Sequence, residues 1–91
     1  MNITLQDCIA ICGLEEDEVA AIAEHEHVPE IAAAALASYL LHKKGGPHEI
    51  KQMLVDDFRA AMKRHDNAHA AELLSALRHF TAAHRDQLLA D

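Results

Sequence analysis

The densest group of side chains that could do chemistry lies between residues 24 and 30. Glu24 and His27 are three positions apart, and Glu30 follows three positions later. Residues three apart share one face of a helix, and carboxylate-bridged di-iron bundles use a Glu-x-x-His pair to hold a metal. The spacing therefore predicts a possible iron or zinc site with Glu24 and His27 as its first ligands.

A complete site of this kind needs more ligands than one such pair supplies. The chain contains Glu-x-x-His once, so a second copy in a symmetric dimer would have to supply the other. The further candidate ligands are Glu30, Asp57 and His65. Asp57 lies at the edge of an apolar stripe, from which it could add carboxylates to the site. In the alternative interpretation, Glu24 is an exposed residue at a helix end and His27 caps the helix or contacts a partner.

A second histidine spacing, His65-x-x-x-His69, is also of interest. Histidines four apart on one continuous helix could chelate zinc or nickel. Asp66 and Asn67, however, are typical of a helix break and cap, and we expect them to interrupt a helix here. The HEXXH pattern of metalloproteases is absent because Asp66, not Glu, follows the first histidine.

Nucleophilic catalysis finds little support in the sequence. Cys8 and Cys12 share an i, i+3, i+4, i+7 stripe with apolar neighbours, which predicts reduced thiols on a buried face. Ser38 and Ser75 fall within predicted helices, and no Gly-x-Ser-x-Gly motif is present. We therefore expect no catalytic residue.

The net charge of −7 is confined to the first third of the chain. Residues 1–30 carry eight acidic residues and no Lys or Arg, whereas residues 31–91 carry seven acidic and eight basic residues. Without a basic stripe the chain is a poor nucleic-acid binder. The acidic third is either a solvated helix start or a surface for a basic protein partner.

The elements that must position these residues are all helical. No segment alternates with a period of two, and turn or cap residues divide the chain into five amphipathic segments. We expect a single domain over residues 1–91, folded as a compact all-α bundle with a long amphipathic C-terminal helix. The expected helices span residues 4–12, 15–27, 30–43, 47–64 and 68–90.

The composition favours self-association. With 3% aromatic residues, the core must come from Ala, Leu, Ile and Val, and a chain of 91 residues buries a small core. The Ala-rich third helix would let another helix approach closely. The fifth helix, up to about 35 Å long, would have more apolar length than four short helices cover, which predicts a homodimer.

The sequence predicts neither a signal peptide nor a membrane span. The longest apolar run, Ile31 to Leu41, has 11 residues, and the N-terminus has no basic region. We expect a cytoplasmic protein.

The run from Ala21 to Ile31, with Cys8 to Gly13 before it and Arg78 to Phe80 after it, resembles short bacterial all-helical proteins of unassigned function. The resemblance covers most of the chain and implies no activity. In its single Glu-x-x-His, the chain is also similar to encapsulated-ferritin-like proteins, which implies a metal site completed by a partner chain. It departs from that pattern because no companion Glu lies on a preceding long helix.

Two hypotheses follow. The first is a non-enzymatic homodimer that acts through protein–protein contacts. The alternative is a ferritin-like protein that binds iron or zinc through Glu and His ligands.

Overall fold

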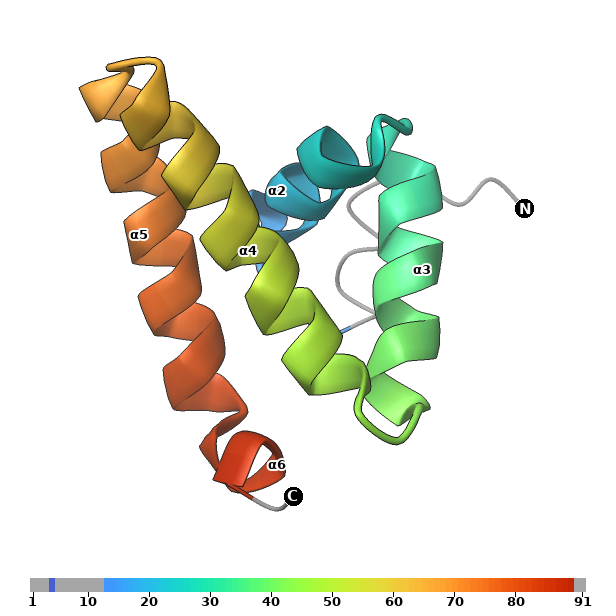
Figure 1. The fold of residues 1–91 in the computed structure, drawn as a ribbon. Helices are drawn as coiled ribbons and strands as arrows, with labels where there is room; N and C mark the ends of the chain where they lie inside the picture. Colours follow the sequence, from blue (N-terminus) through green and yellow to red (C-terminus); the bar gives the residue numbers. More distant parts are fainter. Residues whose placement is uncertain (1–3, 5–12, 90–91) are drawn as a thin grey trace.

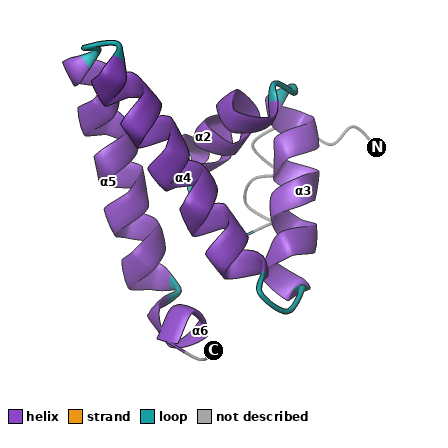
Figure 2. Ribbon diagram, viewed as in Figure 1, coloured by secondary structure: helices purple, strands orange, loops and turns teal. Residues whose placement is uncertain are grey.

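The computed structural model describes residue 4 and residues 13–89, which form five helices. Short turns join these helices (Figure 1). The described residues contain no strand, and the predicted all-α bundle is confirmed (Figure 2). Residues 5–12 of the first expected helix lie outside the described residues. The helices are α2 (Glu16–Glu26), α3 (Glu30–His42), α4 (Gly46–Lys63), α5 (Asn67–Ala83) and α6 (Arg85–Leu89).

Helix α2 begins in the acidic run that the sequence placed at a helix start. The backbone N–H of Glu15 donates to Glu18 Oε1 at 2.8 Å, which satisfies one of the donors left free at a helix N-terminus. Glu16 and Asp17 are exposed, as a solvated helix start requires. Glu18 differs, because it is buried and its Oε2 has no hydrogen-bond partner. Burial raises the pKa of Glu18.

Helices α4 and α5 run side by side along their length, while α3 lies against the other side of α4 (Figure 1). Helix α2 packs against α3, α4 and α5. The predicted break between α4 and α5 is present, with Asp66 Oδ1 accepting from the backbone N–H of His69 at 3.2 Å.

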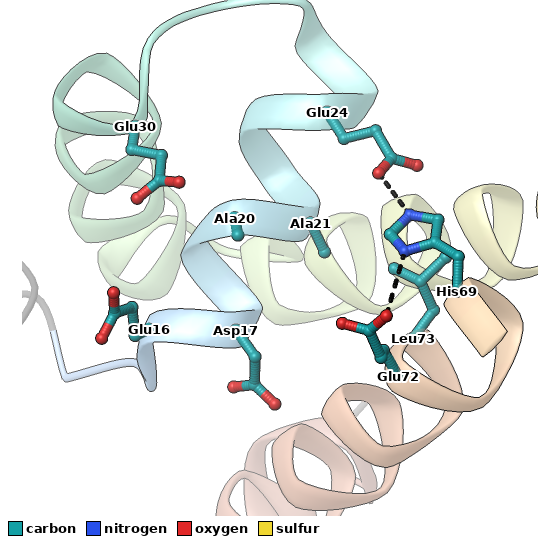
Figure 3. A pocket seen from close by; sticks show the side chains of 9 residues that line it. All are labelled: Glu16, Asp17, Ala20, Ala21, Glu24, Glu30, His69, Glu72 and Leu73. Atoms are coloured by element: carbon teal, nitrogen blue, oxygen red, sulfur yellow. Dashed lines mark hydrogen bonds and ion pairs between the residues drawn. The ribbon is translucent and has the colours of Figure 1, made fainter.

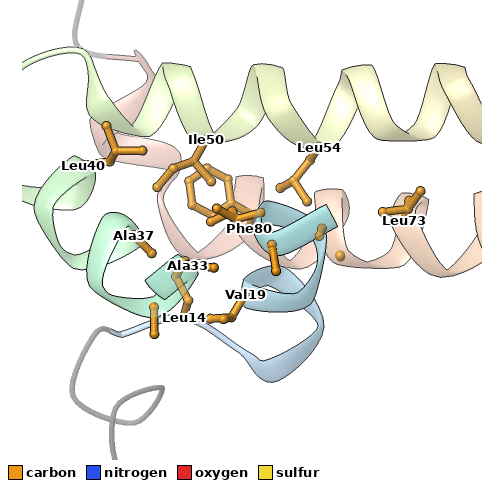
Figure 4. Close-up of a cluster of buried hydrophobic side chains, with 14 of the residues drawn as sticks. Leu14, Val19, Ala33, Ala37, Leu40, Ile50, Leu54, Leu73 and Phe80 are labelled. Carbon is orange, nitrogen blue, oxygen red and sulfur yellow. The ribbon is translucent and has the colours of Figure 1, made fainter. Parts of the chain in front are cut away.

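In the described residues the buried core is built from aliphatic side chains and the ring of Phe80, with Phe58 partly buried against it. Phe80 of α5 is fully buried and lies among side chains of α2, α3 and α4 (Figure 4). Alanines supply much of the remaining core, as the composition predicted. Met62 of α4 lies outside this core and is 49% exposed. The largest fully buried side chains are Phe80, Ile22, Ile50, Leu54 and Val19.

The C-terminal helix is shorter than expected. Helix α5 ends at Ala83, His84 leaves the helical conformation, and the five-residue α6 follows. The His84 ring stacks on Phe80 at 4.4 Å, and its Nδ1 donates to the Phe80 carbonyl at 3.1 Å. The backbone N–H of His84 donates to the same carbonyl at 3.0 Å, so the Phe80 oxygen accepts two bonds at the end of α5. The expectation of one continuous helix to residue 90 was wrong, and α4 is the longest described helix.

The prediction of a homodimer depended on uncovered apolar length along the C-terminal helix, and α5 is shorter than that prediction assumed. The large apolar side chains that are exposed in the described residues lie on α3, α4 and α6, and none lies on α5. Helices α2 and α4 cover the apolar face of α5 within one chain. The described part of α5 therefore offers no large exposed apolar side chain to a second copy, and the homodimer stays a prediction.

Among the described residues, no helix is long and apolar enough to cross a membrane.

Candidate functional site

An acidic pocket of about 370 Å³ lies between α2, the start of α3 and the start of α5 (Figure 3). Two of the predicted ligands, Glu24 and Glu30, line it. The other polar lining residues are Glu16, Asp17, His69 and Glu72. The pocket therefore gathers five carboxylates and one imidazole on a chain whose charge is already negative.

The predicted ligand Glu24 pairs with a histidine far away in the sequence. His69 Nε2 donates to Glu24 Oε1 at 2.5 Å, which joins α5 to α2 across 45 positions. On the other side of the ring, Nδ1 lies 3.9 Å from Glu72 Oε1 (Figure 3). The capping contact at Asp66 fixes the first turn of α5 and thereby holds His69 in place.

A second histidine joins the end of α2 to α4. His25 Nε2 lies 3.3 Å from Asp56 Oδ2, and its Nδ1 lies 2.9 Å from Glu26 Oε2. Partial burial acts to lower the pKa of His25, but the hydrogen bonds to Glu26 and Asp56 outweigh it and raise the pKa. Gln52 and His25 donate to Asp56 and lower the pKa of that carboxyl.

Asp57, another predicted ligand, is buried between these two pairs. It is 6% exposed, and its Oδ2 has no hydrogen-bond partner. Burial raises the pKa of Asp57 to about 6, with the charge of Glu24 adding to the shift and those of His25 and His69 opposing it. Asp57 lies at the edge of the apolar stripe of α4, as predicted. At this position the stripe packs against α2 and α5, so the carboxyl is buried.

The last two predicted ligands lie in turns. His27 follows α2 in the left-handed conformation, with φ 57°, and its backbone N–H donates to the Ala23 carbonyl. His65 follows α4, also left-handed, with φ 62°. Both are exposed. The alternative interpretation of His27 as a helix-capping residue describes its position in the structure.

The five predicted ligands are not brought together on one metal within a single chain. In the described part of the chain, no three His, Cys, Asp or Glu side chains are arranged so that they could hold a metal ion. The i, i+3 relation of Glu24 and His27 is lost because α2 ends at Glu26. A metal site shared between two copies stays a prediction.

The described residues around the pocket do not form an arrangement for acyl transfer. Among them no Ser, Thr, Cys, Lys or Tyr lines the pocket, and both ring nitrogens of His69 are directed at carboxylates (Figure 3). A histidine acting as a general base needs one nitrogen turned toward the substrate or a nucleophile. The Glu24–His69 pair therefore joins two helices in this conformation.

Sequence reasoning found His69 as a possible partner of His65, but it missed the contact with Glu24. A separation of 45 positions leaves no local pattern that could have shown this contact. It also missed Asp56, which is exposed on α4, as the partner of His25.

We expect the Glu24–His69 pair to contribute modestly to stability. Both side chains are about one-third exposed, so solvent screens the attraction and a coupling energy of roughly 0.5–1 kcal/mol is expected. A double-mutant cycle with Glu24→Gln and His69→Ala, followed by urea unfolding, measures it. The matched cycle with Glu72→Gln should give a smaller coupling because that contact is longer, and equal couplings would contradict the assignment.

The outward face of α3 carries a different kind of surface. Ile31 is 52% exposed and Tyr39 is 63% exposed, and the exposed Ala35 lies halfway between them. These residues are four apart, so they form one stripe along the helix. No charged residue occurs from Ile31 to Leu41. Ala33, Ala34, Ala37 and Leu40 form the opposite, buried face.

The structure thus defines an all-α bundle with an acidic pocket on one side and an uncharged apolar stripe on α3. Comparison with protein-family models, with curated proteins and with solved structures gave no match.

Proposed function

We propose that this protein is a non-enzymatic cytoplasmic homodimer that acts through protein–protein contacts, and that the outward face of α3 is its dimer interface. The observation that carries the proposal is the stripe of Ile31, Ala35 and Tyr39, which is apolar and exposed. We call these three residues the α3 stripe.

The chemistry of the α3 stripe suits a second copy of this chain. A protein with a net charge of −7 repels its own copies, and an uncharged face is where that repulsion is weakest. Tyrosine is enriched in protein interfaces because it buries a large ring and keeps a polar hydroxyl. The small side chain of Ala35 lets a second helix approach closely at the middle of the stripe.

In this proposal the dimer interface lies on α3, whereas the sequence predicted it chiefly on the C-terminal helix. Helix α5 is covered within the chain, whereas the α3 stripe has no covering element among the described residues.

Ala35→Arg tests the proposal. A long charged side chain at the centre of the α3 stripe should convert the dimer to a monomer, because an isologous interface places two such charges together. Size-exclusion chromatography with light scattering gives the mass. Ala71→Arg, the same substitution at an exposed position of α5, is the matched control and should remain dimeric.

Far-ultraviolet circular dichroism should show unchanged helicity in both variants, since both alanines are exposed. A folded Ala35→Arg variant that is still dimeric would contradict the assignment of the interface to α3.

A further inference from the structure

The last turn of α2 is joined to the rest of the bundle by polar side chains. The buried residues of α2 end at Ala23, and the side chains that follow it are half-buried or exposed. His25 Nε2 lies 3.3 Å from Asp56 Oδ2 of α4. Glu24 Oε1 accepts from His69 Nε2 of α5 at 2.5 Å. Two histidine–carboxylate pairs therefore connect this turn to two different helices.

Asp57 of α4 lies between these two pairs. Its side chain is 6% exposed, and its Oδ2 has no hydrogen-bond partner among the described residues. The charges that act on it come from α2, from α5 and from its own helix, and belong to Glu24, His25, His69 and Asp56. Of α3, Glu30 lines the same pocket as Glu24 and His69. An ionised Asp57 is therefore a buried charge without a donor, close to a second carboxylate.

Protonation changes the charge of this junction as a whole. With Asp57 neutral and both histidines charged, each carboxylate of the two pairs is balanced by its histidine. With all three protons lost, Glu24, Asp56 and Asp57 are negative, and neither histidine opposes them. The ionic attraction that holds the turn then becomes a repulsion between α2 and α4.

We propose that the last turn of α2 is a latch operated by the proton of Asp57: it stays closed on α4 and α5 while Asp57 is protonated and opens when Asp57 ionises. Opening separates Glu24 from His69 and so widens the acidic pocket on the side that this pair closes (Figure 3). Water then reaches the Asp57 carboxylate, which removes the cost of burying its charge. The latch does not depend on the proposed function.

The turn moves, and not α4 or α5, because those two helices pack against each other along their length (Figure 1). Buried Ala23 precedes the turn, and Val28, which packs against the core, follows it. Residues 24–27 lie between these two anchors and contribute no buried side chain. They can therefore open locally while the core stays in place.

The direction of the pH dependence follows from the folded-state pKa of Asp57. Burial, together with the charge of Glu24, raises this pKa from 3.8 to about 6. In the open latch water surrounds the carboxyl, and we expect its pKa to return toward 3.8. The equilibrium between the closed and open latch then shifts toward the open form by about tenfold from pH 5 to pH 8. His25 also has a raised pKa, so its deprotonation acts in the same direction.

Amide hydrogen exchange of the full chain, measured by NMR at one protein concentration, tests the latch. Protection factors corrected for intrinsic exchange should fall about tenfold from pH 5 to pH 8 for the amides of residues 24–28. They should also lie at least about tenfold below those of Leu54 and Ala76, which are buried in the middle of α4 and α5. Low concentrations of urea should leave the protection of residues 24–28 unchanged, because local opening exposes little surface.

Two variants identify the group that operates the latch. Asp57→Asn keeps the shape of the protonated carboxyl and cannot ionise, so protection of residues 24–28 should change less than about threefold over the same pH range. Asp56→Asn is the matched control at the neighbouring, exposed position. It weakens the contact with His25, so it should lower protection at every pH and keep the tenfold fall.

The outcomes that would overturn the latch differ from one another. Residues 24–28 that are as well protected as Leu54 and Ala76 at every pH would open only when the whole chain unfolds. Weak protection that does not change with pH would mean that the turn frays without involving Asp57. A fall with pH that persists in Asp57→Asn would assign the effect to other groups.

Discussion

Gly46→Ala should destabilise the protein by about 3 kcal/mol or more, because the last turn of α3 lies against the first residue of α4. A Cβ added at Gly46 would come within 1.5 Å of the Leu40 carbonyl oxygen and 2.4 Å of its carbonyl carbon. These are backbone atoms, so relief requires α3 and α4 to move apart. Urea unfolding followed by circular dichroism measures the loss.

The neighbouring glycine provides the matched control. Gly45 has φ 80° but nothing within 4 Å of an added Cβ, so Gly45→Ala should cost only the left-handed backbone strain, about 1 kcal/mol. Equal losses for the two substitutions would contradict the close approach of α3 to α4. The contrast also tests the placement of α3, which carries the proposed interface.

Asp57→Asn should stabilise the protein by about 3 kcal/mol at pH 8 and by about half as much near pH 5, and it should have little effect below about pH 4. The pKa of Asp57 is raised from 3.8 to about 6, so the folded state holds this proton more tightly than the unfolded chain does. The resulting stability is fully present below about pH 3.8 and is lost as the pH rises from there through about 6. Asparagine resembles the protonated carboxyl in shape and carries no charge, so it removes this loss.

Two other groups also make the protein less stable as the pH rises. The pKa values of His25 and Glu18 are also raised in the folded state, so their contributions also decline as the pH rises. We therefore expect the free energy of unfolding of the wild type to fall between about pH 4 and pH 8. Urea unfolding at a fixed protein concentration across this range measures it.

Asp56→Asn is the control for Asp57→Asn. Asp56 is exposed, and its contacts with Gln52 and His25 lower its pKa, so its removal should slightly destabilise the protein and preserve the pH dependence. The assignment would be contradicted if Asp57→Asn kept the wild-type slope, or if both variants changed stability in the same direction.

The helices and most of their ends could be predicted from local signals. The residues Pro29, Gly45 and Asp66 stand at turns or caps because of their own backbone or side-chain chemistry, and the structure has a boundary at each. The break at His84 could not be predicted in this way. No Gly or Pro marks it, and the contacts found there, the His84 ring stacked on Phe80 and bonded to its carbonyl, leave no local pattern in the sequence.

The candidate site was harder to predict than the helices. The Glu24–His69 contact spans 45 positions, so it depends on how α5 packs against α2. The burial of Asp57 has the same origin, since the helical pattern placed it at the edge of a stripe but could not show that α2 covers that edge. The spacing of Glu24 and His27 suggested a shared metal because it assumed a helix that continues to His27.

The α3 stripe illustrates a different limit. Ile31 to Leu41 is apolar on all sides of the helix, so periodicity cannot distinguish its buried face from its exposed face. Only the packing of α3 on α2 and α4 shows that Ile31, Ala35 and Tyr39 point outward.

The mass of the untagged wild-type protein in solution tests the central proposal most directly. Sedimentation equilibrium at micromolar concentrations should give twice the chain mass of 10.0 kDa, with a shift toward the chain mass on dilution. A single species at 10.0 kDa over the whole concentration range would contradict the proposal that α3 forms a homodimer interface.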